Sequence, residues 1–128
     1  MNIGVELDPG WAWDDKIPLA QAVKIGNFLY ISGQIALDPD GNLIGAGDMK
    51  AQSQKVFDNI EAIVKSAGGS VKNLIKITTY LTDMDRYPEF NEIRMKIFKD
   101  YRPASTTVGV TALAFKGLLV EVEAVAYI

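Results

Sequence analysis

Two carboxylates stand in an otherwise apolar segment near the end of the chain, VEVEAVAYI at residues 120 to 128. Glu121 and Glu123 are two residues apart, so in a strand their side chains lie on the same face of a sheet. Burying an unpaired carboxylate costs on the order of several kcal/mol. Such a carboxylate therefore either acts in a site, as an acid, as a base or by positioning a water molecule, or pairs with a lysine or arginine across the sheet.

A cluster of hydroxyl side chains precedes these carboxylates, in the segment RPASTTVGV at residues 102 to 110. Ser105 and Thr107 can donate hydrogen bonds to a small ligand, together with nearby backbone N–H groups. The high β-propensity of threonine is an alternative reason for Thr106 and Thr107. The segment is thus a candidate binding strand or an ordinary one.

The composition excludes several kinds of chemistry. The 128 residues include no cysteine and no histidine. A cysteine nucleophile, a disulfide framework and any triad with an imidazole base are therefore excluded. Zinc is disfavoured because its sites draw mainly on these two residue types. We expect no metal and no cofactor, and any catalysis has to use carboxylates, lysine, arginine, tyrosine, hydroxyls or the backbone.

The charge and the apolar segments limit the possible partners. The net charge of -3 gives no general attraction to nucleic acid or to anionic membranes. The N-terminal residues do not form a basic segment followed by an apolar one, and no apolar run approaches the roughly 20 residues that span a bilayer. We expect a cytoplasmic protein that binds neither nucleic acid nor membranes.

Hydrophobic periodicity predicts an order of β-β-β-α-β-α-β-β. The predicted elements are a hairpin at 20–32, a short strand at 43–44, a helix from Asp48 to about residue 67, a strand at 74–83, a helix at 87–99, and strands at 106–113 and 118–128. Two amphipathic helices can cover only one face of such a sheet. The sequence therefore predicts a single α+β domain over residues 1–128, built as a two-layer sandwich.

The uncovered sheet face favours oligomerisation. Alternation along the last strand places Val120 and Val122 on one side, and Glu121, Val125 and Tyr127 on the other. If the first side meets the helices, the second side faces either water or another subunit. A contact between subunits would bury the apolar residues and bring the glutamates to the edge of a shared cleft.

Successive segments of the chain resemble one protein family. These segments are KIGNFLYISGQIALDPDGNLI, FDNIEAIVKSAGGS, VKNLIKITTYLTDM, YPEFNEIRMKIF, RPASTTVGV and LLVEVEAVA. From Ile17 to Ile128 they resemble the YjgF/RidA superfamily of reactive intermediate deaminases, also called endoribonuclease L-PSP. The resemblance implies a chorismate-mutase-like fold, a homotrimer whose sheets form a central barrel, and a small-molecule cleft at each subunit interface.

The resemblance also implies a reaction and the residues that perform it. RidA-type members hydrolyse enamines and imines to a 2-keto acid and ammonia. Ser32 and Gly33 match the SGQ turn that lines the family's cleft, and Asn91 matches an asparagine of the second helix. Glu121 matches a carboxylate that positions water or relays a proton. Asn91 could instead be a solvated helix residue.

Three departures from the family pattern affect the expected substrate. Ser105 stands where the family has an arginine that binds the substrate carboxylate, Thr107 replaces a frequent cysteine, and Leu19 replaces a tyrosine. Activity on 2-imino acids is therefore doubtful, and neutral imines or enamines become candidate substrates. Arg102 or Lys116 could supply a replacement cation.

A non-catalytic protein is the alternative interpretation. Loss of both the arginine and the tyrosine is compatible with a trimer that binds a small metabolite or a partner protein in the same cleft. Trp11 and Trp13 could line the mouth of that cleft, or they could hold the N-terminal segment on the domain as an apolar staple.

Overall fold

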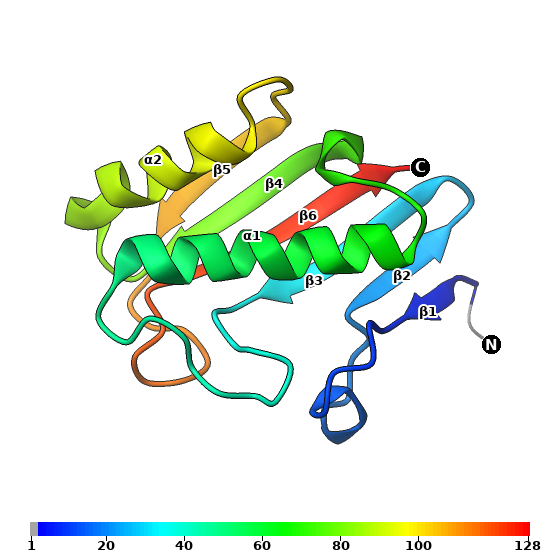
Figure 1. Cartoon of the computed structure of the whole chain (residues 1–128), viewed down its shortest axis with the longest axis horizontal. Helices are drawn as coiled ribbons and strands as arrows, with labels where there is room; N and C mark the ends of the chain where they lie inside the picture. The colour runs from blue at the N-terminus through cyan, green and yellow to red at the C-terminus, as the bar shows by residue number, and fades with distance from the viewer. Residues whose placement is uncertain (1–2) are drawn as a thin grey trace.

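The computed structural model describes residues 3–128 as a six-stranded sheet with two α-helices. The strands are β1 (Val5–Leu7), β2 (Ala22–Ile25), β3 (Phe28–Gln34), β4 (Leu74–Leu81), β5 (Ala104–Gly109) and β6 (Val120–Tyr127). The helices are α1 (Met49–Ser66) and α2 (Tyr87–Ile97), with short 3-10 turns at Asp14–Lys16, Val71–Asn73 and Met84–Arg86. The strand order is β1-β2-β3-β6-β4-β5 (Figure 1). Only the β4–β5 pair is parallel, so the sheet is mixed.

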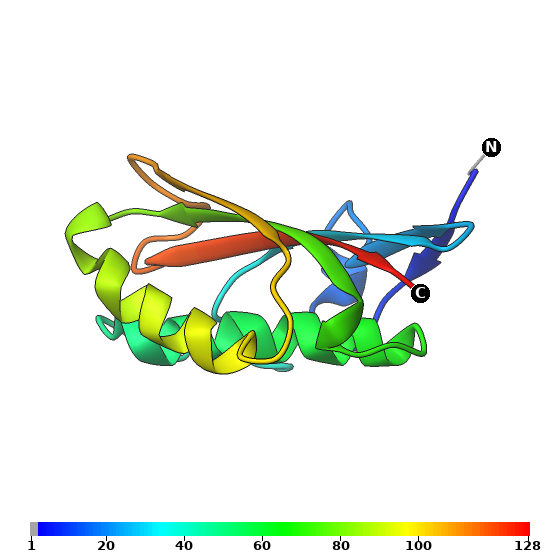
Figure 2. The same cartoon turned by 90° about the horizontal axis from the view of Figure 1, so that it is seen from above.

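Both helices lie on the same face of the sheet, and the other face is uncovered in the single chain (Figure 2). β6 lies in the middle of the sheet, and its side chains alternate between the two faces. Val120, Val122, Ala124 and Ala126 are buried beneath the helices. The predicted α+β two-layer sandwich with two helices on one face is confirmed.

The helices begin and end where the sequence provides the required chemistry. Asp48 caps α1, because its Oδ1 accepts a hydrogen bond of 3.0 Å from the backbone N–H of Ala51. Gly68 follows the helix with a φ of +89°, a conformation that favours glycine. Pro88 lies in the first turn of α2, where a backbone N–H would have no acceptor within the helix, so its missing N–H costs no helical hydrogen bond.

Aromatic contacts fix α2 against α1. The ring of Phe57 on α1 stacks on Phe90, with centroids 6.0 Å apart, and meets Phe98 edge-on at 5.5 Å. Phe57 and Phe90 are fully buried. These contacts set the rotation of α2 and therefore decide which of its polar side chains lie under the sheet.

Three predicted strands require correction. Leu43 forms only an isolated bridge with Leu37, so residues 43–44 are not a strand of the sheet. The third strand of the first half is instead β1, near the N-terminus. The strand predicted at 106–113 is displaced to 104–109, and the one predicted from 118 begins at Val120. The predicted order of elements was thus correct although one of its members was wrong.

The uncovered face carries an apolar patch. Phe28, Tyr30 and Tyr127 expose 41%, 50% and 51% of their surface there, and Phe28 meets Tyr127 edge-on with centroids 5.2 Å apart. Val125 pairs with Tyr30 in the sheet and is partly buried. Aromatic groups gathered in this way are typical of a surface that another protein covers. No helix within residues 3–128 is long and apolar enough to cross a membrane.

Candidate functional site

The sheet separates the predicted site residues into two groups. Ser105 and Thr107 pair with the buried residues Ile77 and Thr79, so they lie on the helix-covered face together with Asn91 of α2. Glu121 lies on the uncovered face, because its neighbours Val120 and Val122 face the helices. Gly33 also borders that face at Glu121. One chain alone does not bring the two groups together.

On the uncovered face, Glu121 packs against the backbone of Gly33. A methyl group placed on Gly33 would lie 2.7 Å from the Oε2 atom of Glu121, so a larger residue there would displace this carboxylate from its present position. Glu121 is partly buried, and this burial raises the pKa of its carboxyl group above the ordinary value, with a smaller contribution from the charge of Glu123. A carboxyl group with a raised pKa exchanges protons more readily near neutral pH.

Glu123 is occupied by a different contact. Its Oε1 accepts a hydrogen bond from the hydroxyl of Tyr80 on the neighbouring strand β4. This hydrogen bond is the main cause that raises the pKa of Tyr80. Glu123 is exposed. The hydrogen bond from Tyr80 therefore holds the Glu123 carboxylate in place, whereas the Glu121 carboxylate lies beside Gly33.

A buried chain of side-chain amides fixes the segment around Gly33, which matches the SGQ turn named from the sequence and here forms the irregular end of strand β3. Gln34 donates through Nε2 to the Ser32 carbonyl at 3.0 Å and to Oε1 of Gln21 at 2.9 Å. Gln21 in turn donates to Asp14 at 2.9 Å. The register between β3 and β6 shifts between Ile31 and Gln34. The network therefore holds this irregular end of β3 in one conformation.

The hydroxyl of Ser32 is itself used in the turn. It donates to the carbonyl of Ala20 at 2.7 Å, and the backbone N–H of Ser32 donates to the carbonyl of Gln21 at 2.9 Å. The Ser32 oxygen can still accept a hydrogen bond from a ligand. Its clearest role in the single chain is to hold the turn beside Glu121.

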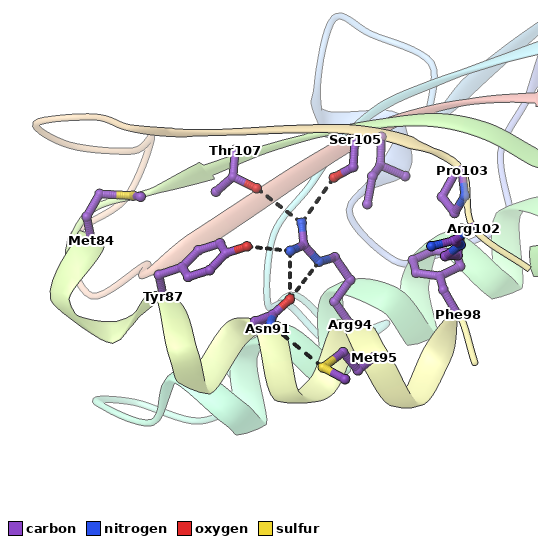
Figure 3. Close-up of a pocket in the computed structure, with 11 residues that line it drawn as sticks. Met84, Tyr87, Asn91, Arg94, Met95, Phe98, Arg102, Pro103, Ser105 and Thr107 are labelled. Carbon is purple, nitrogen blue, oxygen red and sulfur yellow. Dashed lines mark hydrogen bonds between the residues drawn. The ribbon is translucent and has the colours of Figure 1, made fainter.

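The helix-covered side contains a pocket of about 650 Å³ between α2 and β5 (Figure 3). Asn91, Ser105 and Thr107, three of the candidate binding residues named from the sequence, line it. The apolar part of its wall includes Ile77, Met84, Met95 and Phe98. Because β5 is the edge strand of the sheet, the pocket lies at the rim of the domain, where a second chain can reach it.

Arg94 dominates this pocket, and the sequence analysis did not identify it. Its Nη1 donates to Ser105 Oγ at 3.1 Å and to Thr107 Oγ1 at 3.4 Å, and its Nη2 donates to the Tyr87 hydroxyl at 2.5 Å (Figure 3). Nη2 and Nε also donate to Asn91 Oδ1, at 2.6 Å and 3.1 Å. The available signal was spacing, because Arg94 follows Asn91 by three residues and Phe90 by four, on the inward flank of α2.

The other sequence candidates lie elsewhere. Arg102 lines the same pocket but is exposed, and Leu19 is also exposed. Lys116 lines a second pocket of about 360 Å³ that also includes Trp13. Trp11 packs against the core and stacks on Trp13 with centroids 5.4 Å apart, which favours the staple interpretation. Within residues 3–128 no group of acidic side chains is arranged to hold a metal ion.

Comparisons with known proteins agree with the resemblance seen in the sequence. A family model described as Endoribonuclease L-PSP matches residues 13–128. The chain belongs to this family, the YjgF/RidA family. A RutC family protein from Pyrococcus horikoshii is 44% identical over 110 residues, which cover 86% of each chain. The sequence-based recognition of the family is confirmed.

Relatives within the YjgF/RidA family include a named deaminase and solved structures. A 2-iminobutanoate/2-iminopropanoate deaminase from Dermatophagoides farinae is 32% identical over 111 residues, covering 87% of this chain and 86% of the relative. The crystal structure of RidA from an Antarctic Psychrobacter species is 37% identical, with a TM-score of 0.82 over 100% of this chain and 99% of that one. The fold is therefore shared over the full length.

Proposed function

We propose that the protein hydrolyses the C=N bond of small imines, and of enamines after their conversion to imines, at a site formed by two subunits of a homotrimer. The observation that carries the proposal is the carboxyl group of Glu121, partly buried beside Gly33 with a raised pKa. The name of the mite relative, a 2-imino acid deaminase, supports the same reaction class.

In the proposed reaction, Glu121 acts as a general base toward water. Its carboxylate takes a proton from water as the water oxygen adds to the imine carbon, and gives that proton to the nitrogen, which forms a carbinolamine. The carboxylate then takes the proton of the carbinolamine hydroxyl and delivers it to the nitrogen as the C=O bond forms and the C–N bond breaks. The products are a carbonyl compound and ammonia, so atoms and charge balance. General acid-base help of this kind is worth roughly 10²- to 10⁴-fold, which is sufficient for an imine that already reacts with water.

The placement of the residues supports a site between subunits. Glu121 and Gly33 lie on the uncovered face, and the pocket with Asn91 and Ser105 lies under the helices at the edge strand β5. A neighbouring chain that packs its own uncovered face near this edge would bring its glutamate to the pocket. The exposed aromatic patch on that face gives a physical reason for such packing.

The reaction is tested by the rate of imine disappearance. Imines with and without a carboxylate would be generated in the reaction mixture by an oxidase, and their lifetime measured with and without the protein. We expect the wild-type protein to accelerate hydrolysis of at least one of them. The Glu121→Gln variant should lose that acceleration by about 100-fold or more.

The alternative is a protein that binds a metabolite without turning it over. It would be favoured if no imine or enamine in the panel disappears faster with the protein, while a small ligand still raises its melting temperature in both the wild type and Glu121→Gln. That result would contradict the proposed hydrolysis.

A further inference from the structure

The guanidinium of Arg94 is held by neutral groups only. Its five N–H donors face the hydroxyls of Tyr87, Ser105 and Thr107 and the amide oxygen of Asn91. Its carbon atom Cζ also lies 5.3 Å from the centre of the Phe90 ring. The planar guanidinium group is therefore fixed in one orientation, because several contacts from α2 and β5 converge on it.

No carboxylate among residues 3–128 pairs with this arginine, although other cations of the chain have such partners. Arg86 binds Glu89, and Lys50 binds Glu92. The pocket around Arg94 is lined by a second cation, Arg102, and by no acidic side chain. Arg94 itself is only partly exposed. The pocket thus has a positive charge that an anion can neutralise.

The groups around Arg94 suit a carboxylate in particular. A guanidinium can bind both oxygens of a carboxylate at once through two parallel charge-assisted hydrogen bonds, which the separate neutral oxygens around it cannot reproduce. Ser105 and Thr107 now accept from Nη1, and their hydroxyls can turn to donate to the incoming carboxylate instead. Met84 and Met95 line the remaining space, where the apolar part of a small acid can lie.

We propose that Arg94 binds the carboxylate of a small 2-imino acid, and of the 2-oxo acid formed from it, in the pocket between α2 and β5. The resemblance to RidA places the corresponding arginine at residue 105, on the strand. Here the helix α2 supplies the guanidinium across the pocket, and Ser105 is one of its supports. The turnover part of this inference rests on the proposed function, whereas the binding part does not.

This assignment makes 2-imino acids substrates, although Ser105 alone predicted otherwise. Arg102 and Lys116 were the candidate cations of the sequence, but neither has a comparable set of contacts. Arg102 is exposed at the pocket wall, and Lys116 lines a different pocket. Arg94 therefore determines the preference for an anionic substrate.

The test is a calorimetric titration with 2-oxobutanoate and with its neutral amide, 2-oxobutanamide. For Arg94→Met we expect the affinity for 2-oxobutanoate to fall by about 100-fold, because two charge-assisted hydrogen bonds are lost. Binding of the amide should change by less than about threefold. Arg94→Lys keeps the charge but loses the planar fork, so an intermediate loss of about tenfold is expected.

Two matched variants separate Arg94 from general charge effects. Lys96→Met removes one positive charge from the exposed side of the same helix, and Arg102→Met removes the other arginine of the pocket wall. Lys96→Met should retain 2-oxobutanoate binding within about threefold of the wild type. Arg102→Met removes a charge of the pocket wall itself, so it should weaken binding, but clearly less than Arg94→Met does. If Arg94→Met does not fold, as judged by its melting curve, the comparison of Arg94→Lys with Lys96→Met decides.

Binding and turnover are measured separately, so the two proposals can fail independently. Loss of 2-oxobutanoate binding in Arg94→Met, with no imine hydrolysis by the wild type, supports this inference and contradicts the proposed function. If the wild type hydrolyses only neutral imines and does not bind 2-oxobutanoate, the proposed function is supported and this inference is contradicted. The inference is overturned if wild type and Arg94→Met bind 2-oxobutanoate equally, if neither binds it at about 10 mM, or if Arg102→Met is the variant that loses binding.

Discussion

At the scale of single residues, the chemistry depends on the contrast between Glu121 and Glu123. Both were visible in the sequence as carboxylates on one strand face, and the family position selected Glu121. The structure gives the physical difference, because Glu121 packs against Gly33 whereas Glu123 binds the hydroxyl of Tyr80. Only a three-dimensional arrangement could assign these contacts, since Tyr80 is 43 residues away in the chain.

The raised pKa of Glu121 predicts opposite effects of one substitution on activity and stability. A carboxyl group with a raised pKa in the folded protein destabilises the fold when it is ionised, and this penalty disappears as pH falls through the raised pKa. Glu121→Gln should therefore raise the melting temperature at pH 7.5 by about 1 to 3 °C, a modest gain because the group is partly exposed. The gain should shrink toward pH 4.

The pH profile of activity tests the ionisation of Glu121 independently of stability. If ionised Glu121 is the general base, kcat/KM should fall as pH decreases through its raised pKa. Glu123→Gln is the control on the same strand: it should keep turnover within a few-fold, and it should move the acidic limb to lower pH because one neighbouring negative charge is gone. An acidic limb that does not move would contradict this account of the shift.

At the scale of elements, sequence periodicity identified both helices, the central strands and their layer. It missed β1, which has only three residues, and it assigned a strand at 43–44 where only one bridge forms. Such short segments carry too little periodicity to be recognised. Arg94 was missed because a charged residue on an amphipathic helix usually faces water. The packing of Phe57 on Phe90 sets the rotation of α2 so that the Arg94 side chain reaches Ser105 on β5.

Moving the arginine from α2 to β5 tests whether either element can supply the guanidinium to the pocket. Arg94→Ser alone should bind 2-oxobutanoate about 100-fold more weakly, as for Arg94→Met. Adding Ser105→Arg returns a guanidinium to the strand position that the family resemblance implies, and should restore the affinity to within about tenfold of the wild type. Calorimetry on the single and double variants measures this. A double variant no better than Arg94→Ser would show that the pocket requires the arginine on the helix.

At the scale of the whole molecule, the two halves of the proposed site lie on opposite faces of one sheet. The glutamate half lies on the same face as the exposed aromatic patch, and the arginine half lies at the edge strand. The sequence predicted the uncovered face from the count of helices, but it could not show that the face divides the site. The proposed site makes assembly a condition for catalysis, because neither half has the complete chemistry.

Mixed trimers of two inactive variants test whether each site combines Glu121 of one chain with Arg94 of another. Glu121→Gln and Arg94→Met chains with different tags would be expressed together, and assemblies carrying both tags would be purified and checked by light scattering for a mass of about three times 14.0 kDa. In a cyclic trimer whose sites each combine two neighbouring chains, every mixed assembly has one intact site of the three.

The mixed trimers should therefore hydrolyse a 2-imino acid at about one third of the wild-type rate, while each variant alone is at least about 100-fold slower than the wild type. Mixed trimers that are as inactive as the separate variants would contradict the claim, because Glu121 and Arg94 would then have to act within the same chain or not in the same site.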